Sequence, residues 1–104
     1  MKQWREPPIE QPDYPTDAQL KAIRKWPIER GEREWFEYIK KIWHWPDWGI
    51  RETPKQYHIS TGGWSGNEEI IGAMQSHLVF WSLTWFSSRA GGHYVFRKRD
   101  GAEK

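Results

Sequence analysis

The sequence predicts an α+β domain in which two N-terminal helices and one short helix pack on a small antiparallel sheet that ends in a C-terminal hairpin. Apolar residues follow helical spacing in the first half of the chain and strand-like alternation in the second half. Between them, a glycine-rich loop at residues 60–67 joins a short strand to a short helix. The chain has 104 residues, which is enough for one domain with its own core.

The predicted domain spans residues 16–100. An extended arm over residues 1–15 precedes it, because that stretch holds four of the chain's seven prolines and proline disfavours helices and central strands. A tail over residues 101–104 is expected to fray.

Two helices are predicted before the sheet. Thr16 and Gln19 have the spacing of a capping box, so the first helix begins after Thr16, and Pro27 ends it. The second helix runs from about 32 to 43, because apolar residues recur there at helical spacing: Trp35, Ile39 and Ile42.

Strand signals follow at about 50–53 and 55–60. After the glycine-rich loop, a short helix is predicted over residues 68–75. Ser65 and Glu68 form a second capping-box pattern, so we expect Ser65 to cap this helix.

The C-terminal hairpin is predicted from alternation. Residues 78–87 alternate in the manner of a strand and give the strongest strand signal of the chain. Residues 88–92 are a glycine-rich turn, and residues 93–97 return as the partner strand.

Charge and composition limit the classes of function. The 16 basic and 14 acidic residues give a net charge of +2, and this balance argues against nucleic-acid binding. The only basic cluster is Arg97-Lys98-Arg99, a pattern usual for solvated strand ends. Without cysteine there is no disulfide or thiolate metal site. No apolar run approaches the roughly 20 residues of a membrane span, and the N-terminus lacks a signal-peptide pattern, so a cytoplasmic protein without membrane contact is expected.

The glycine-rich loop is the first candidate site. Glycine lets a backbone approach a ligand closely, and the first amides of a helix attract anions. The loop matches neither a Walker A nor a G-x-G-x-x-G pattern, so it is either a tight turn with a helix cap or a binding surface. Its candidate ligand-binding residues are Thr61, Gly62, Gly63, Trp64, Ser65 and Asn67.

The hairpin turn supplies further candidates: Arg89, His93 and Tyr94. If the two glycine-rich loops meet, Arg89 offers a cation and forked donors, and Trp64 and Tyr94 offer stacking surfaces. Either His58 or His93 offers a titratable donor. Such a pocket suits an anionic, aromatic ligand of nucleotide type. The sequence leaves open whether the loops converge.

A tryptophan-rich turn is a separate candidate for contact with another protein. The chain has nine tryptophans, and Trp43, Trp45 and Trp48 are too close in sequence for all to be buried. Exposed tryptophan is enriched at interfaces, so this turn predicts a partner contact or self-association. Edge pairing along residues 93–97 is a second route to a homo-oligomer.

Catalysis has little support in the sequence. The four histidines are not spaced as metal ligands, and no carboxylate cluster accompanies them. We therefore expect no metal or cofactor and favour a binding protein over an enzyme, with the enzyme class left open.

One resemblance adds context. The segments 58–68, 80–81 and 89–96, together with Trp85, resemble small uncharacterised proteins encoded by bacteriophages and prophages. The resemblance covers about residues 58–96 and implies no activity and no catalytic residue. It implies a small accessory protein acting in the bacterial host cytoplasm. Phage accessory proteins of this size often bind and block a host component or sequester a nucleotide signal used in host defence, so the resemblance implies a role of that type.

Overall fold

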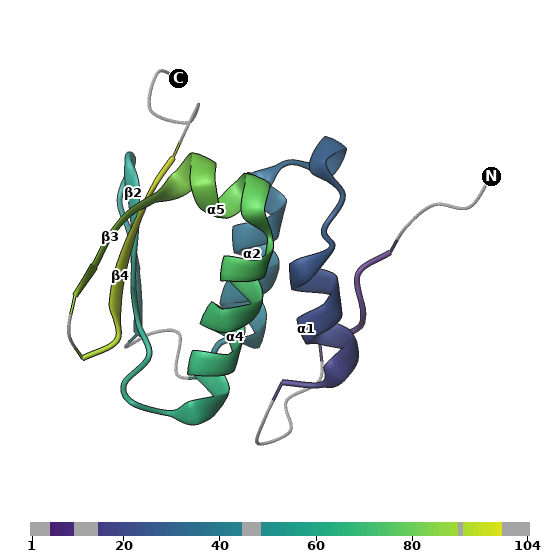
Figure 1. The fold of residues 1–104 in the computed structure, drawn as a ribbon, viewed down its shortest axis with the longest axis horizontal. Coiled ribbons are helices and arrows are strands. Elements are labelled where there is room, and N and C mark those ends of the chain that lie inside the picture. Colours follow the sequence, from purple (N-terminus) through teal and green to yellow (C-terminus); the bar gives the residue numbers. More distant parts are fainter. Residues whose placement is uncertain (1–4, 10–14, 45–48, 90, 99–104) are drawn as a thin grey trace.

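The fold is an antiparallel sheet with helices packed on one of its faces (Figure 1). The computed structural model describes residues 5–9, 15–44, 49–89 and 91–98. The elements, in chain order, are α1 (Asp17–Arg24), the 3-10 helix η1 (Ile28–Arg30), α2 (Glu32–Ile42), β1 (Ile50–Glu52), β2 (Gln56–Ser60), α4 (Ser65–Ser76), α5 (Leu78–Thr84), β3 (Trp85–Arg89) and β4 (His93–Arg97). The predicted α+β class and the C-terminal hairpin are confirmed.

The sheet has the strand order β1-β2-β4-β3, and all of its neighbouring strands are antiparallel. β4 therefore lies inside the sheet, hydrogen-bonded to β2 on one side and β3 on the other. The prediction that residues 93–97 offer a free edge is wrong, because the long-range pairing with β2 occupies that edge. In the described structure the edge strands are β1 and β3.

The core lies between the helices and one face of the sheet. Phe36 of α2 stacks on Tyr57 of β2, with ring centroids 4.2 Å apart, and packs edge-on against Phe96 of β4. Trp35 is fully buried, and its indole N–H donates to the carbonyl of Ile23 at 2.9 Å. The apolar stripe predicted for the second helix is thus the stripe that joins α2 to the sheet.

The start of α1 also holds the described part of the arm. The predicted capping box is confirmed: the Gln19 amide donates to Thr16 Oγ1, and the Thr16 amide donates to Gln19 Oε1, both at 3.0 Å. The buried Gln19 side chain donates in addition to the Pro8 carbonyl. Burial raises the pKa of Tyr38 to about 12, so its hydroxyl stays protonated and donates to the Pro7 carbonyl.

Residues 78–84 form helix α5, so the strand predicted for residues 78–87 is wrong over most of its length. His77 explains the difference. Its Nδ1 accepts from the Phe80 amide at 3.2 Å, its Nε2 lies 2.9 Å from the Trp26 carbonyl oxygen, and its ring stacks on Phe80. This tertiary anchor starts a helix and buries Phe80 and Thr84 together, which outweighs the strand propensity of the segment.

The start of α4 also differs from the prediction. The residue at the N-cap position is Trp64, and Ser65 is the first helical residue, so the predicted capping box of Ser65 and Glu68 is wrong. Gly66 and Asn67, in the first turn of the helix, are buried. Among the described helices, none is long and apolar enough to cross a membrane.

Candidate functional site

The two glycine-rich loops converge at one end of the sheet. Ser60 pairs with His93 at the end of β2 and β4, and the Thr61 amide then donates to the Gly92 carbonyl at 3.0 Å. Gly62, Gly63 and Gly92 all have positive φ, which only glycine adopts readily. The juxtaposition that the sequence left open is therefore present in the structure.

Two of the predicted ligand-binding side chains instead hold this corner together. Thr61 and Asn67 are each 1% exposed. Thr61 Oγ1 accepts from the Gly63 amide, and Asn67 bonds both the amide and the carbonyl of His44. Because these polar atoms are already engaged and shielded, we assign both residues a structural role. The correction follows from burial, which the polar character of the loop did not reveal.

Trp64 is half-buried at the start of α4. Its ring stacks on the imidazole of His44 with centroids 4.1 Å apart, and it covers Gly66 so closely that a Cβ there would overlap the indole. The indole is thus anchored to the protein. Ser65, beside it, is exposed.

Arg89 and His93 lie directly opposite each other on β3 and β4, and both are exposed. Tyr94 is adjacent to His93 in sequence and so points to the other face, where it packs against Trp81. We call the face that is turned away from the helices the outer face. Arg89 and His93 share that face, and the prediction that Tyr94 joins them is wrong because successive strand residues alternate.

The tryptophan-rich turn is described only at its start. Trp43 is 1% exposed and belongs to the core, so its side chain is not among the exposed aromatic groups from which a partner contact was predicted. Trp45 and Trp48 lie outside the described residues.

A hollow of about 600 Å³ lies at the opposite end of the sheet, among residues for which the sequence predicted no binding role. It lies between the β1–β2 turn and the end of β4, and its lining residues are Thr53, Pro54, Lys55, Gln56, Arg97 and Lys98. Three of these six carry a positive charge and none a negative one. The basic cluster at Arg97 was the one signal of this site in the sequence.

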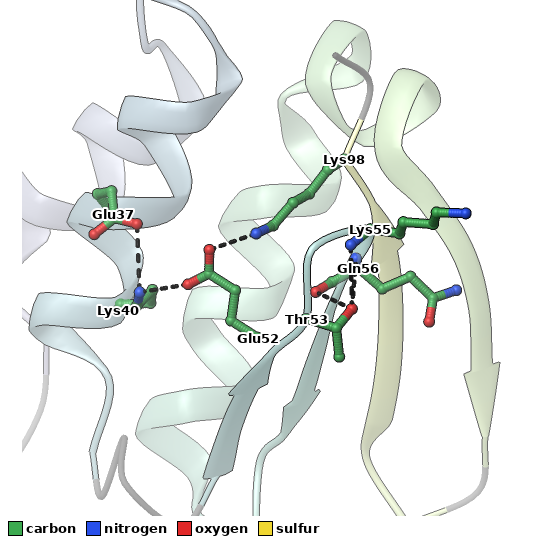
Figure 2. Close-up of polar contacts among 7 residues, drawn as sticks. All are labelled: Glu37, Lys40, Glu52, Thr53, Lys55, Gln56 and Lys98. Atoms are coloured by element: carbon green, nitrogen blue, oxygen red, sulfur yellow. Dashed lines mark hydrogen bonds and ion pairs between the residues drawn. The ribbon is translucent and has the colours of Figure 1, made fainter. Parts of the chain in front are cut away.

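Hydrogen bonds that involve backbone amides fix the shape of the hollow. Thr53 Oγ1 accepts from the amides of Lys55 and Gln56, at 3.3 and 2.9 Å, and this fixes the β1–β2 turn (Figure 2). The Lys98 amide donates to the Lys55 carbonyl at 2.9 Å, which ties the turn to β4. The backbone that carries the lining side chains is therefore held in place by hydrogen bonds.

Figure 2 also shows that the charged side chains of this region point in two directions, some toward α2 and one away from it. Glu52 and Lys98 point toward α2, where Glu52 bonds both Lys98 and Lys40, and Lys40 in turn bonds Glu37. Lys55 points away from α2 and is exposed. Partial burial acts to raise the pKa of Glu52, but the hydrogen bonds from Lys40 and Lys98 outweigh it and lower that pKa.

The charge of Lys98 is largely offset, since its Nζ contacts Glu52 and lies 4.9 Å from the centre of the Tyr57 ring. Lys55 and Arg97 have no ion pair among the described residues. The Arg97 guanidinium lies 4.3 Å from the centre of the Phe86 ring, which is 46% exposed. A cationic hollow with an aromatic ring beside it can bind a phosphate group and stack a base.

An apolar margin lies along α5 and the edge strand β3. Its members are large hydrophobic side chains that remain at least 40% exposed: Leu78, Val79, Leu83, Trp85 and Phe86. Exposed patches of this kind mark contact surfaces more often than isolated exposed residues do.

The fold and its surfaces define a class: a small α+β protein whose antiparallel sheet has helices on one face and basic side chains on the other. The sequence matches no known protein-family model, and no curated protein and no solved structure is significantly similar to it.

Proposed function

We propose that the protein is a small, non-enzymatic binding protein that holds a phosphate-bearing, nucleotide-like ligand in the hollow at the β1–β2 turn. The observation that carries this proposal is that Lys55 and Arg97 have no ion pair with any described residue. Lys55 and Arg97 face the hollow, while the neighbouring carboxylate of Glu52 turns toward α2 and binds Lys40 and Lys98. Within the described part of the chain, the hollow thus presents positive charge to solvent without a competing acid.

Size and chemistry support a nucleotide. Small-molecule sites commonly measure about 300–1,000 Å³, and the hollow of about 600 Å³ falls within that range. Guanidinium and ammonium groups both bind phosphate, the former with two parallel hydrogen bonds. The Phe86 ring beside Arg97 offers a surface for the base.

The resemblance to small phage-encoded proteins extends the proposal to a biological role. A phage-type accessory protein that holds a nucleotide signal in the host cytoplasm would sequester it from the host. Arg89 and His93 lie at the end of the sheet opposite the hollow, so they are outside the nucleotide site proposed here.

Calorimetric titration with a panel of mono-, di-, tri- and cyclic nucleotides tests the proposal. Lys55→Gln and Arg97→Gln are each expected to weaken binding about tenfold or more, as loss of a charge-assisted hydrogen bond does. Lys21→Gln and Arg24→Gln remove matched, exposed charges from α1 and are expected to bind normally. Absence of binding across the panel, or an equal loss in the α1 variants, would refute the proposal.

A second candidate function is self-association through the apolar margin. β3 is an edge strand, so its free backbone groups can pair with a second copy while Leu83 and Trp85 become buried. α5 and β3 offer this contact in addition to the tryptophan-rich turn, whose predicted contact through Trp45 and Trp48 stays a prediction. Sedimentation velocity over a concentration series is expected to show a dimer that Leu78→Glu with Leu83→Glu abolishes. A monomer at all concentrations would exclude it.

A further inference from the structure

The outer face of the sheet gathers basic side chains from every strand. Tyr57, Ile59 and Phe96 are buried under the helices. Their neighbours in sequence therefore point the opposite way. The register places Arg51 opposite His58, and His93 between Ser60 and Arg89, on that face.

No acid balances these charges within the sheet. Strands β2, β3 and β4 contain neither Asp nor Glu, and Glu52 of β1 points toward α2. Partial burial, and then electrostatic interactions with Arg51, His93 and Arg89, lower the pKa of His58, so side chains from all four described strands lie near enough to interact. Figure 1 shows all of the labelled helices on the other side of the sheet.

We infer that the ligand of this protein is a single-stranded nucleic acid that runs from the hollow across the outer face of the sheet. This inference rests on the proposed function, because the hollow supplies one of its phosphate contacts. The always-charged contacts are four exposed side chains: Arg51, Lys55, Arg89 and Arg97.

The extent of the charged surface favours a chain over a single nucleotide. His93 and Arg97 are four residues apart on β4, which corresponds to roughly 13 Å along the strand, and the sheet is about 14 Å wide between its outer strands. One phosphate group can contact one end of this surface, whereas consecutive phosphates of a strand can contact both. Phe86 offers an exposed ring on which a base can stack.

Single strands fit better than duplexes for a geometric reason. A duplex is read by an element that enters a groove, and the outer face is a sheet surface with no described element projecting from it. Splayed bases of a single strand can instead lie on exposed rings and between arginines. The nearly neutral total charge argued against nucleic-acid binding. The fold, however, places basic side chains together on one face, which the total charge does not reveal.

Fluorescence anisotropy with labelled oligothymidylates of 2, 4, 8 and 12 nucleotides tests this inference. Affinity is expected to rise with length, and the 12-mer is expected to bind at least tenfold more tightly than a 12-base-pair duplex of matched composition. Four phosphate contacts predict a slope of about −2.8 in log K against log salt. Arg51→Gln with Arg89→Gln is expected to halve that slope and leave mononucleotide binding in the hollow unchanged.

The outcomes separate the two proposals. Mononucleotide binding with no gain from chain length would overturn the single-strand inference and keep the proposed function. Tighter binding of the duplex would also overturn the inference. Failure of nucleotides and oligonucleotides alike would refute both. Arg24→Gln with Lys21→Gln is the charge-matched control, and thermal unfolding of each variant verifies that it is folded.

Discussion

Replacement of Gly92 by alanine tests whether the junction of the two glycine-rich loops holds the domain together. Gly92 has φ of 79°, a conformation that costs a side-chain-bearing residue about 1–2 kcal/mol. A Cβ on Gly92 would also overlap Thr61 Oγ1, while Thr61 Cβ would lie 3.4 Å away. Because Thr61 is buried and hydrogen-bonded to Gly63, it cannot move without cost, and overpacking of this kind adds about 1–3 kcal/mol.

Gly91 provides a matched control. Its φ is 91°, but a Cβ there would meet no described atom within 4 Å. Gly91→Ala is therefore expected to cost only the backbone strain, about 1–2 kcal/mol, whereas Gly92→Ala is expected to cost about 2–5 kcal/mol. Urea unfolding followed by tryptophan fluorescence measures both values. Since 1 kcal/mol corresponds to roughly 4–8 °C in Tm for a domain of this size, thermal unfolding also resolves the difference.

A double mutant identifies the atom responsible. Thr61→Ala removes Oγ1 and leaves Cβ at an ordinary contact distance from the new side chain. In that background Gly92→Ala is expected to cost no more than Gly91→Ala does. Equal costs for Gly91→Ala and Gly92→Ala in the native background would refute the reasoning, as would an undiminished cost in the double mutant.

Three further predictions concern stability. His77→Ala is expected to destabilise the protein by about 2–3 kcal/mol, because it removes the hydrogen bonds that His77 makes to the Phe80 amide and the Trp26 carbonyl. Urea unfolding measures the change, and a loss under about 0.5 kcal/mol would contradict the prediction. Glu52→Gln is expected to cost under about 1 kcal/mol at pH 7. The native protein is expected to lose stability as the pH falls below 4.5, since the pKa of Glu52 is lowered on folding, and the variant should lose less. Parallel plots of unfolding free energy against pH for the two proteins would disprove this. The pKa of His58 is also lowered from 6.5, so the unfolded chain takes up that proton first and stability falls as the pH drops below 6.5. In the His58→Gln variant, Tm measured by thermal unfolding should depend less on pH in that range. A dependence of Tm on pH equal to that of the native protein would count against a lowered pKa of His58.

Local patterns predicted the elements that depend on neighbours in sequence. The capping box of Thr16 and Gln19, the apolar stripe of α2 and the turn at Gly91 and Gly92 all lie within a few residues, and the structure has each of them. The segment from Leu78 to Thr84 could not be assigned in this way. Its alternation suits a strand, but His77 bonds the distant Trp26 and starts a helix.

The candidate site divides along the same line. Sequence alone marked Arg89, His93 and the cluster at Arg97 as chemically notable. It could not show that Asn67 is consumed by hydrogen bonds to His44, because that contact joins residues 23 positions apart. Nor could it show that Tyr94 packs against Trp81 and that Trp43 is buried in the core.

The sequence by itself determined the class of fold, the two leading helices and the hairpin, because hydrophobic period, caps and glycine turns act over one or two turns of chain. Only the tertiary structure decided where the charges lie. The register of β1, β2, β4 and β3 directs arginines outward and Glu52 inward. That register depends on pairing between residues up to 41 positions apart, as between Gln56 of β2 and Arg97 of β4. A chain with nearly balanced charges thus has a sheet with one basic face, because strand pairing decides on which face of the sheet each side chain lies.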